Sequence, residues 1–170
     1  GFADSFGTGA NQFDIDFVDI SANPGVTRST NTNGDTLETF TNGVVGDYTD
    51  PGYNYRMGTY EVTNDQWDKF KDEYGAVTGD PSSAYDSNPY WPGSNVPTTR
   101  VSWYEAAQFV NYLNTSSGYQ KAYNFTGTQG QSDYALGTWS AGNAWEGENL
   151  YRHKDAQYFL PSEDEWVKAA

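Results

Sequence analysis

The sequence contains no cysteine, one histidine and one methionine among its 170 residues. The absence of cysteine excludes disulfides, thiolate metal sites and cysteine nucleophiles within these residues. Because His153 is the single histidine, a metal site built from two or three histidines of this chain is excluded as well. No stretch approaches the roughly 18 consecutive apolar residues that a bilayer-spanning helix needs, so the sequence predicts no membrane span.

Basic residues are also scarce. Lysine and arginine number 9 against 23 aspartates and glutamates, which gives a formal net charge of −14. Nucleic acids and anionic membrane surfaces recruit clustered Lys and Arg, so we expect neither as a partner. Cations are the more natural small partners of such a chain.

Aromatic rings are what the chain has in quantity. Phe, Trp and Tyr make up 17% of the residues, while all hydrophobic residues together reach 36%. The length fits one domain of ordinary size, and we expect its core to be aromatic. Trp91, Trp139 and Trp145 lie in long segments rich in Gly, Ser and Asn. They suit either this core or stacking on a sugar ring, and we favour the core.

Three segments carry the same helix-start signal. Thr63, Ser102 and Ser162 are each followed three residues later by Gln or Glu, a capping box that satisfies two of the first backbone amides of a helix. We therefore predict helices that begin after each of these residues. The second of them carries an apolar stripe at helical spacing, formed by Ala106, Phe109, Val110 and Leu113.

Strand signals are weaker. Residues 13–20 read FDIDFVDI, which predicts a half-buried strand with a bulge where the alternation slips between Phe17 and Val18. Asn42-Gly43 is the preferred dipeptide of a tight hairpin turn, and it predicts a hairpin over residues 38–45. The segments 75–100 and 115–157 show little periodicity, and we expect packed aromatic loops there.

Candidates for chemistry are few. His153 stands among charged residues in a predicted loop, and we interpret it as a solvated surface residue rather than a catalytic one. Calcium is the metal that the residue types favour, because oxygen ligands from Asp and Asn are abundant. Asn31, Asn33 and Asp35 place such oxygen ligands at alternate positions, and residues 47–50 also carry oxygen ligands. Both stretches also fit ordinary turns.

Three segments taken together indicate a family. They are 55–67 (YRMGTYEVTNDQW), 96–107 (VPTTRVSWYEAA) and 159–170 (FLPSEDEWVKAA). In this order they resemble motifs of the formylglycine-generating enzyme family, whose domains are also called sulfatase-modifying factor domains. Phe159 stands where the third motif usually has arginine. The group that pairs with that guanidinium in the family must therefore be arranged differently in this chain.

The resemblance implies an α+β fold of the C-type-lectin-like, formylglycine-generating-enzyme type, with few short helices and strands and long irregular loops. It runs from Phe13 to Ala170, so we expect residues 1–12 to be an N-terminal arm and residues 13–170 the N-terminal portion of such a domain. The residues that the resemblance assigns to the fold are Glu61, Thr63, Asn64, Ser102, Trp103, Glu105, Leu160, Pro161, Glu165 and Trp166.

The family's catalytic chemistry has no counterpart in these residues. In the family, the calcium ligands and the copper-binding cysteine pair that oxidises a sulfatase cysteine to formylglycine lie in the second half of the domain. The resemblance therefore brings neither a catalytic residue nor a copper site to this chain.

Three functions stay open. The first is an exported, non-catalytic structural or binding module of the family, which self-assembles or pairs with a chain supplying the missing half-domain. The second is the N-terminal fragment of a formylglycine-generating oxidase whose cysteines lie in a C-terminal half. The third is an extracellular glycan-binding or calcium-binding domain. Composition and the start at Gly1 lead us to expect a secreted bacterial protein whose signal peptide has been removed.

Overall fold

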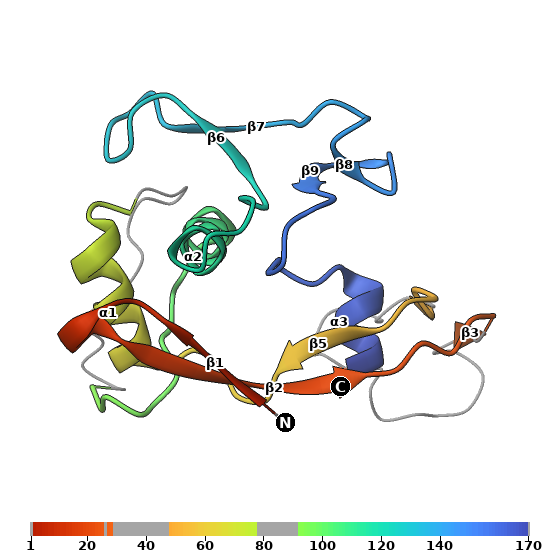
Figure 1. Cartoon of the computed structure of the whole chain (residues 1–170), viewed down its shortest axis with the longest axis horizontal. Coiled ribbons are helices and arrows are strands. Elements are labelled where there is room, and N and C mark those ends of the chain that lie inside the picture. The colour runs from red at the N-terminus through yellow and green to blue at the C-terminus, as the bar shows by residue number, and fades with distance from the viewer. Residues whose placement is uncertain (1, 26, 29–47, 78–91, 170) are drawn as a thin grey trace. The chain divides into compact units, whose positions relative to one another are not determined.

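Figure 1 shows a computed structural model of the chain, which describes residues 2–25, 27–28, 48–77 and 92–169. These residues form short antiparallel strands and three α-helices, namely α1 (Asn64–Tyr74), α2 (Trp103–Ser116) and α3 (Glu163–Ala169). The arrangement is α+β, as predicted. The chain divides into two units: the α1–α2 unit is residues 3–16 and 60–160, and the α3 unit is residues 1–2, 17–59 and 161–170.

All three predicted capping boxes are present. At α1, the Gln66 backbone amide donates to Thr63 Oγ1 over 3.3 Å, and the Thr63 amide donates back to Gln66 Oε1 over 2.9 Å. Ser102 caps α2 and Ser162 caps α3 in the same reciprocal way. Helix α1 ends where Gly75 takes a φ of 88°, a left-handed conformation that glycine adopts without steric cost.

The core of the α1–α2 unit is aromatic, as expected. Trp67 and Phe70 on α1 pack on Phe109 of α2, with ring centroids 5.7 and 5.1 Å apart. Phe13, at the start of strand β2 (Phe13–Ile20), stacks on the same Phe109 ring at 6.1 Å. Phe70 is 0% exposed. Such ring pairs each add about 0.5–1.5 kcal/mol beyond the burial of their surface, so helix packing depends on rings rather than aliphatic chains.

Helix α2 is buried more widely than its predicted stripe. Phe109, Val110 and Leu113 are buried as expected, but so are the polar Asn111 and Asn114. The Asn111 side chain exchanges two hydrogen bonds with the backbone of Tyr123, at 2.8 and 2.9 Å. The prediction was too narrow because α2 also binds later segments through buried polar groups.

The segment 115–157, for which the sequence predicts packed loops, contains two hairpins. Strand β6 (Asn124–Thr126) pairs with β7 (Ala135–Gly137), and β8 (Ala144–Trp145) pairs with β9 (Asn149–His153). In the first hairpin, Gly127 has a φ of 88°, and a Cβ there would lie 2.2 Å from the carbonyl oxygen of Asp133. This turn therefore requires glycine.

Strand β2 takes part in both units. It lies between β1 (Phe2–Phe6) and β5 (Tyr55–Gly58) in a three-stranded sheet, and it follows a short 3-10 turn, η1 (Gly9–Asn11). In the α3 unit, β3 (Thr27–Arg28) also pairs with β4 (Tyr48–Thr49). The β2–β5 register runs without a shift from Phe17 opposite Gly58 to Ile20 opposite Tyr55. The bulge predicted at Phe17–Val18 is thus absent from this pairing, and Val18 is simply exposed.

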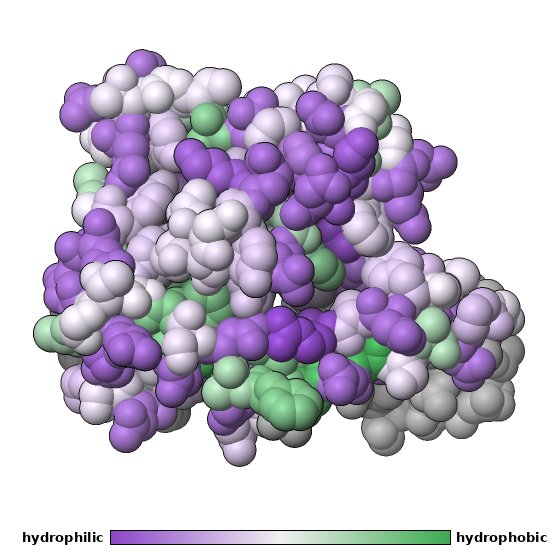
Figure 2. Space-filling model, in the orientation of Figure 1, coloured by the Kyte–Doolittle hydropathy of each residue, from purple (hydrophilic) through white to green (hydrophobic). Residues whose placement is uncertain are grey.

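Hydrophilic and near-neutral residues cover most of the face drawn in Figure 2, and strongly hydrophobic residues show only in small patches. No helix in the described part of the chain is long and apolar enough to cross a membrane. Trp91 and the hairpin predicted around Asn42-Gly43 lie outside the described residues.

Candidate functional site

A hollow of about 360 Å³ opens beside the N-terminus of α1, within the α1–α2 unit. Three segments form it: the first half of β2, the residues that lead into α1, and the stretch at residues 95–97. The lining residues are Asp14, Ile15, Asp16, Tyr60, Glu61, Val62, Thr63, Gln66, Asn95 and Pro97. We refer to this set as the hollow.

Gln66 joins the two main walls. Its Oε1 completes the capping box with Thr63, and its Nε2 donates to the backbone carbonyl of Asp14 over 2.8 Å. The side chain that starts α1 therefore also fixes strand β2 at the same spot.

Backbone hydrogen bonds hold the third wall. The amide of Thr98 donates to Val62 O over 2.8 Å, and the amide of Asn64 donates to Val96 O over 3.0 Å. The Asn64 side chain adds a bond to Gly93 O at 3.0 Å. With all three segments tied together, the hollow is built from fixed backbone.

The lining is acidic and aromatic. Asp14, Asp16 and Glu61 contribute carboxylates, and the lining contains no Lys, Arg, His or Cys. Asp14 Oδ1 accepts the hydroxyl of Ser5 over 2.5 Å. Tyr60 is 77% exposed, so its ring faces solvent rather than the core. The hollow can accept hydrogen bonds and pack an apolar face, but it offers neither a thiol nor an imidazole.

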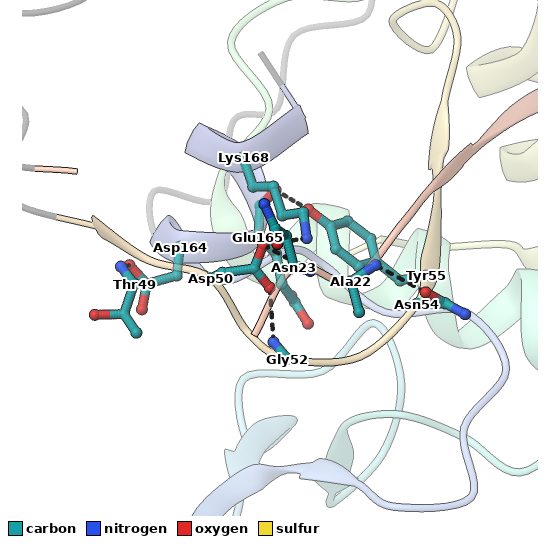
Figure 3. A network of polar contacts seen from close by, with 10 residues as sticks. All are labelled: Ala22, Asn23, Thr49, Asp50, Gly52, Asn54, Tyr55, Asp164, Glu165 and Lys168. Carbon is teal, nitrogen blue, oxygen red and sulfur yellow. Dashed lines mark hydrogen bonds and ion pairs between the residues drawn. The ribbon is translucent and has the colours of Figure 1, made fainter. Parts of the chain in front are cut away.

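A second polar cluster lies in the α3 unit (Figure 3). Lys168 of α3 forms an ion pair with the Asp50 carboxylate, which also accepts the amides of Asn23 and Gly52 at 3.2 and 2.9 Å. Burial raises the pKa of Asp50, but the hydrogen bonds from Lys168 and the two amides outweigh it, so the pKa is lowered overall. The carboxylate is thus held ionised by partners within the fold.

Glu165 joins the same cluster from α3. It is 0% exposed, it caps the helix with Ser162, and it accepts the hydroxyl of Tyr53. The hydroxyl of Tyr55 donates to the backbone carbonyl of Glu165. These contacts of Lys168 and Glu165 fasten α3 to its unit, which favours a structural role for the cluster.

The two stretches predicted as calcium sites have different outcomes. Asn31, Asn33 and Asp35 lie outside the described residues. In the second stretch, Asp50 uses its carboxylate for Lys168 and backbone amides, which favours a structural role. Within residues 2–25, 27–28, 48–77 and 92–169, no group of three or more His, Cys, Asp or Glu side chains is arranged to hold a metal ion.

The residues assigned to the fold divide between scaffold and hollow. Glu61 and Thr63 line the hollow, and Asn64 fixes its third wall. Among the others, Ser102, Glu105 and Glu165 form capping boxes. The Leu160 amide donates to the hydroxyl of Tyr123, Pro161 is exposed, and the two tryptophans Trp103 and Trp166 are 45% and 47% exposed.

Sequence reasoning missed the acidic side of the hollow. Asp14 and Asp16 alternate with the buried Phe13 and Ile15 along β2, so the strand prediction already placed both carboxylates on the opposite face. Nothing local indicated that this face lies next to Tyr60.

The interpretation of His153 as a solvated surface residue is wrong. The residue is 7% exposed, and its ring packs edge-on against Trp139 with centroids 4.7 Å apart. Its charged neighbours suggested exposure, but the adjacent Arg152 is itself buried, with its guanidinium carbon 4.2 Å from the Trp145 ring and 3.4 Å from the Phe159 ring. Phe159, which replaces the arginine of the motif, therefore serves as a platform for Arg152.

Comparison with known proteins agrees with the motifs. Residues 47–170, more than half of the chain, match the sulfatase-modifying factor enzyme 1-like domain. No curated protein and no solved structure matches the chain. The matched range includes all three capping boxes and the α1 side of the hollow. The chain therefore belongs to the sulfatase-modifying factor enzyme 1-like family.

Proposed function

We propose that these residues form an exported, non-catalytic binding module of this family, with a C-type-lectin-like fold, and that the hollow binds a glycan. The observation that carries the proposal is the hollow itself. It places the exposed ring of Tyr60 next to the carboxylates of Asp16 and Glu61, on walls that hydrogen bonds hold in place.

The chemistry of the lining matches a sugar. Hydroxyl groups of a sugar donate hydrogen bonds, and bonds to an ionised acceptor are shorter and stronger than neutral ones. The apolar C–H face of a sugar ring packs on an aromatic side chain such as Tyr60. The volume, about 360 Å³, falls within the range of roughly 300–1,000 Å³ that is common for small-molecule sites.

An inorganic cation is the alternative that carboxylates suggest. The described residues contain no group of three or more His, Cys, Asp or Glu side chains arranged for a metal ion. An aromatic ring at the edge of the hollow contributes nothing to coordination but much to sugar packing. A neutral polyhydroxyl ligand therefore fits the lining better.

The sequence supports a non-catalytic role. The chain has no cysteine, so these residues have no counterpart of the copper-binding pair that the family uses for formylglycine formation. The polar groups around the capping boxes are committed to the scaffold, as with Glu165 and its bonds to Ser162 and Tyr53. What remains exposed and polar in the hollow suits binding.

The test is an NMR titration of the ¹⁵N-labelled chain with three neutral trisaccharides: cellotriose, chitotriose and mannotriose. We expect at least one to shift the amide signals of residues 14–16 and 60–66. Tyr60→Ala and Glu61→Gln should each weaken the binding of that sugar. Tyr119→Ala and Glu148→Gln, which alter exposed residues outside the lining, are the matched controls and should leave binding unchanged.

Two outcomes contradict the proposal. If no sugar binds, or if the shifts lie elsewhere and Tyr60→Ala has no effect, the hollow is not a glycan site. If the bound trisaccharide is cleaved, or if a sulfatase-derived cysteine peptide is converted to formylglycine when copper is added, the module is not a non-catalytic one.

A further inference from the structure

His153 accepts a hydrogen bond that only its neutral form can accept. The backbone amide of Asp155 donates to His153 Nδ1 over 3.1 Å. A nitrogen that accepts an N–H carries no proton, so this bond specifies the tautomer with the proton on Nε2. Protonation of the imidazole would put a proton on Nδ1, directly against the Asp155 amide.

The surroundings of the ring also offer a hydrogen-bond acceptor for the protonated form of His153. The carboxylate Oδ2 of Asp155 lies 3.9 Å from Nδ1, beyond hydrogen-bond distance but within reach of a small rotation. Once protonated, Nδ1 becomes a donor, and this carboxylate is the acceptor beside it. The same residue thus offers its amide to the neutral ring and its carboxylate to the charged one.

Other charged groups around the ring are engaged elsewhere or exposed. Lys154 donates its ammonium to Gly142 O over 2.6 Å, and Arg152 stacks on Trp145 and Phe159. From the segment before Tyr123, the backbone carbonyl of Ala122, next to the exposed Lys121, accepts the backbone amide of His153. The loop that packs on the ring contributes the uncharged Trp139, and β8 contributes the uncharged Ala144 opposite His153.

The turn that would rearrange connects β9 to a firmly held segment. His153 bonds through its amide to Ala122 O at 2.9 Å, and its carbonyl accepts the amide of Ala156 at 3.2 Å. Just beyond, Tyr158 is held by Asn114 of α2 through both its amide and its carbonyl. Because both sides are fixed, a change at Nδ1 must be absorbed within residues 153–156.

From this geometry we propose that residues 153–156 form a pH-sensitive turn. With neutral His153, the Asp155 amide is bonded to Nδ1. When His153 is protonated, the imidazolium releases that amide and turns to the Asp155 carboxylate, which loosens the connection between the β8–β9 hairpin and the segment held by α2.

The first test uses the unmodified chain. Long-range ¹⁵N–¹H NMR of the single histidine should show the Nε2–H tautomer at neutral pH, with Nδ1 unprotonated. The Nδ1–H tautomer, or a rapidly exchanging mixture, would overturn the proposal, since Nδ1 could then not accept the Asp155 amide.

The second test is hydrogen exchange at about pH 7 and about pH 5, a range over which histidine changes charge. After correction for intrinsic exchange, protection of the Asp155 amide should fall about tenfold at the lower pH, as expected when one hydrogen bond is lost. The Lys154 amide, bonded to Asn143 O at 2.9 Å, is the internal control and should stay protected.

A variant separates the effect of His153 protonation from other effects of low pH on the chain. His153→Phe keeps a ring against Trp139 but has no acceptor, so its Asp155 amide should be unprotected at both pH values. Protection that is unchanged by pH in the unmodified chain contradicts the proposal, as does a pH-dependent loss that persists in His153→Phe. Should this variant not fold, the tautomer measurement and the pH dependence of Asp155 amide protection in the unmodified chain still test the proposal.

Discussion

Replacing Asn114 should disconnect the segment after β9 from helix α2. Asn114 is 0% exposed. Its Oδ1 accepts the amides of Gln157 and Tyr158 at 3.1 and 2.9 Å, and its Nδ2 donates to Tyr158 O at 2.8 Å. In Asn114→Ala, the amide and the carbonyl of the buried Tyr158 both lose their hydrogen bond to Asn114.

The magnitude follows from the loss of these two hydrogen bonds to buried backbone groups. A buried polar group left without a partner costs about 1–3 kcal/mol, so the pair gives about 2–6 kcal/mol. The substitution also vacates space that a water molecule can enter, which satisfies part of the loss. We therefore expect the free energy of unfolding to fall by about 2–4 kcal/mol, within the lower part of that range.

Urea denaturation followed by tryptophan fluorescence measures this change. Thr115→Ala, at the next and exposed position of α2, is the matched control, and its effect should stay within about 0.5 kcal/mol. The exchange of the Gln157 and Tyr158 amides should accelerate in Asn114→Ala only. A loss below about 1 kcal/mol, comparable to one ordinary hydrogen bond, with unchanged exchange of these amides would refute the reasoning.

Two further predictions concern a helix cap and pH. Ser102→Ala removes one of the two reciprocal hydrogen bonds with Glu105. It should lower the free energy of unfolding, measured by a thermal melt, by about 1 kcal/mol. An unchanged melting temperature would contradict the role of the cap. The pKa of Glu73 is lowered from 4.5 because its carboxylate accepts hydrogen bonds from Thr8 and Tyr112. A lowered folded-state pKa means that this stabilisation is present above 4.5 and is lost as the pH falls through the folded-state value. Acid titrations of stability should thus be flatter below 4.5 for Glu73→Gln than for the unmodified chain, and identical slopes would contradict the assignment.

The helix starts could be predicted because a capping box is local. Thr63 and Gln66 lie three residues apart, and the bonds between them form wherever the chain turns into a helix. The first half of β2 was predictable for a similar reason, since Phe13 and Ile15 alternate with Asp14 and Asp16.

The short strands and the hollow depend on distant contacts. Asn111 meets Tyr123 at a separation of 12 residues and Asn114 meets Tyr158 at 44, and these bonds fix the segments around the hairpins. The hollow requires Gln66 to reach the backbone of Asp14, 52 residues away. No sequence pattern predicts such pairs. A polar amide side chain on a helix is expected to face solvent unless its buried hydrogen-bond partner is known.

His153 shows how local charge can mislead. Its neighbours Arg152 and Lys154 suggest an exposed loop, but Arg152 stacks on two rings and Lys154 reaches the carbonyl of Gly142. Long basic side chains bury their stems or charges on aromatic faces when such faces are available. In a chain with 17% aromatic residues, a charged stretch is therefore weak grounds for expecting exposure.

The central claim is that the hollow beside α1 binds a glycan. A crystal structure of the chain with the trisaccharide that binds in the NMR titration tests it most directly. We expect one sugar ring to lie on the face of Tyr60, with its hydroxyls donating to the carboxylates of Asp16 and Glu61. A sugar bound at another surface, with the hollow occupied only by water, would contradict the account.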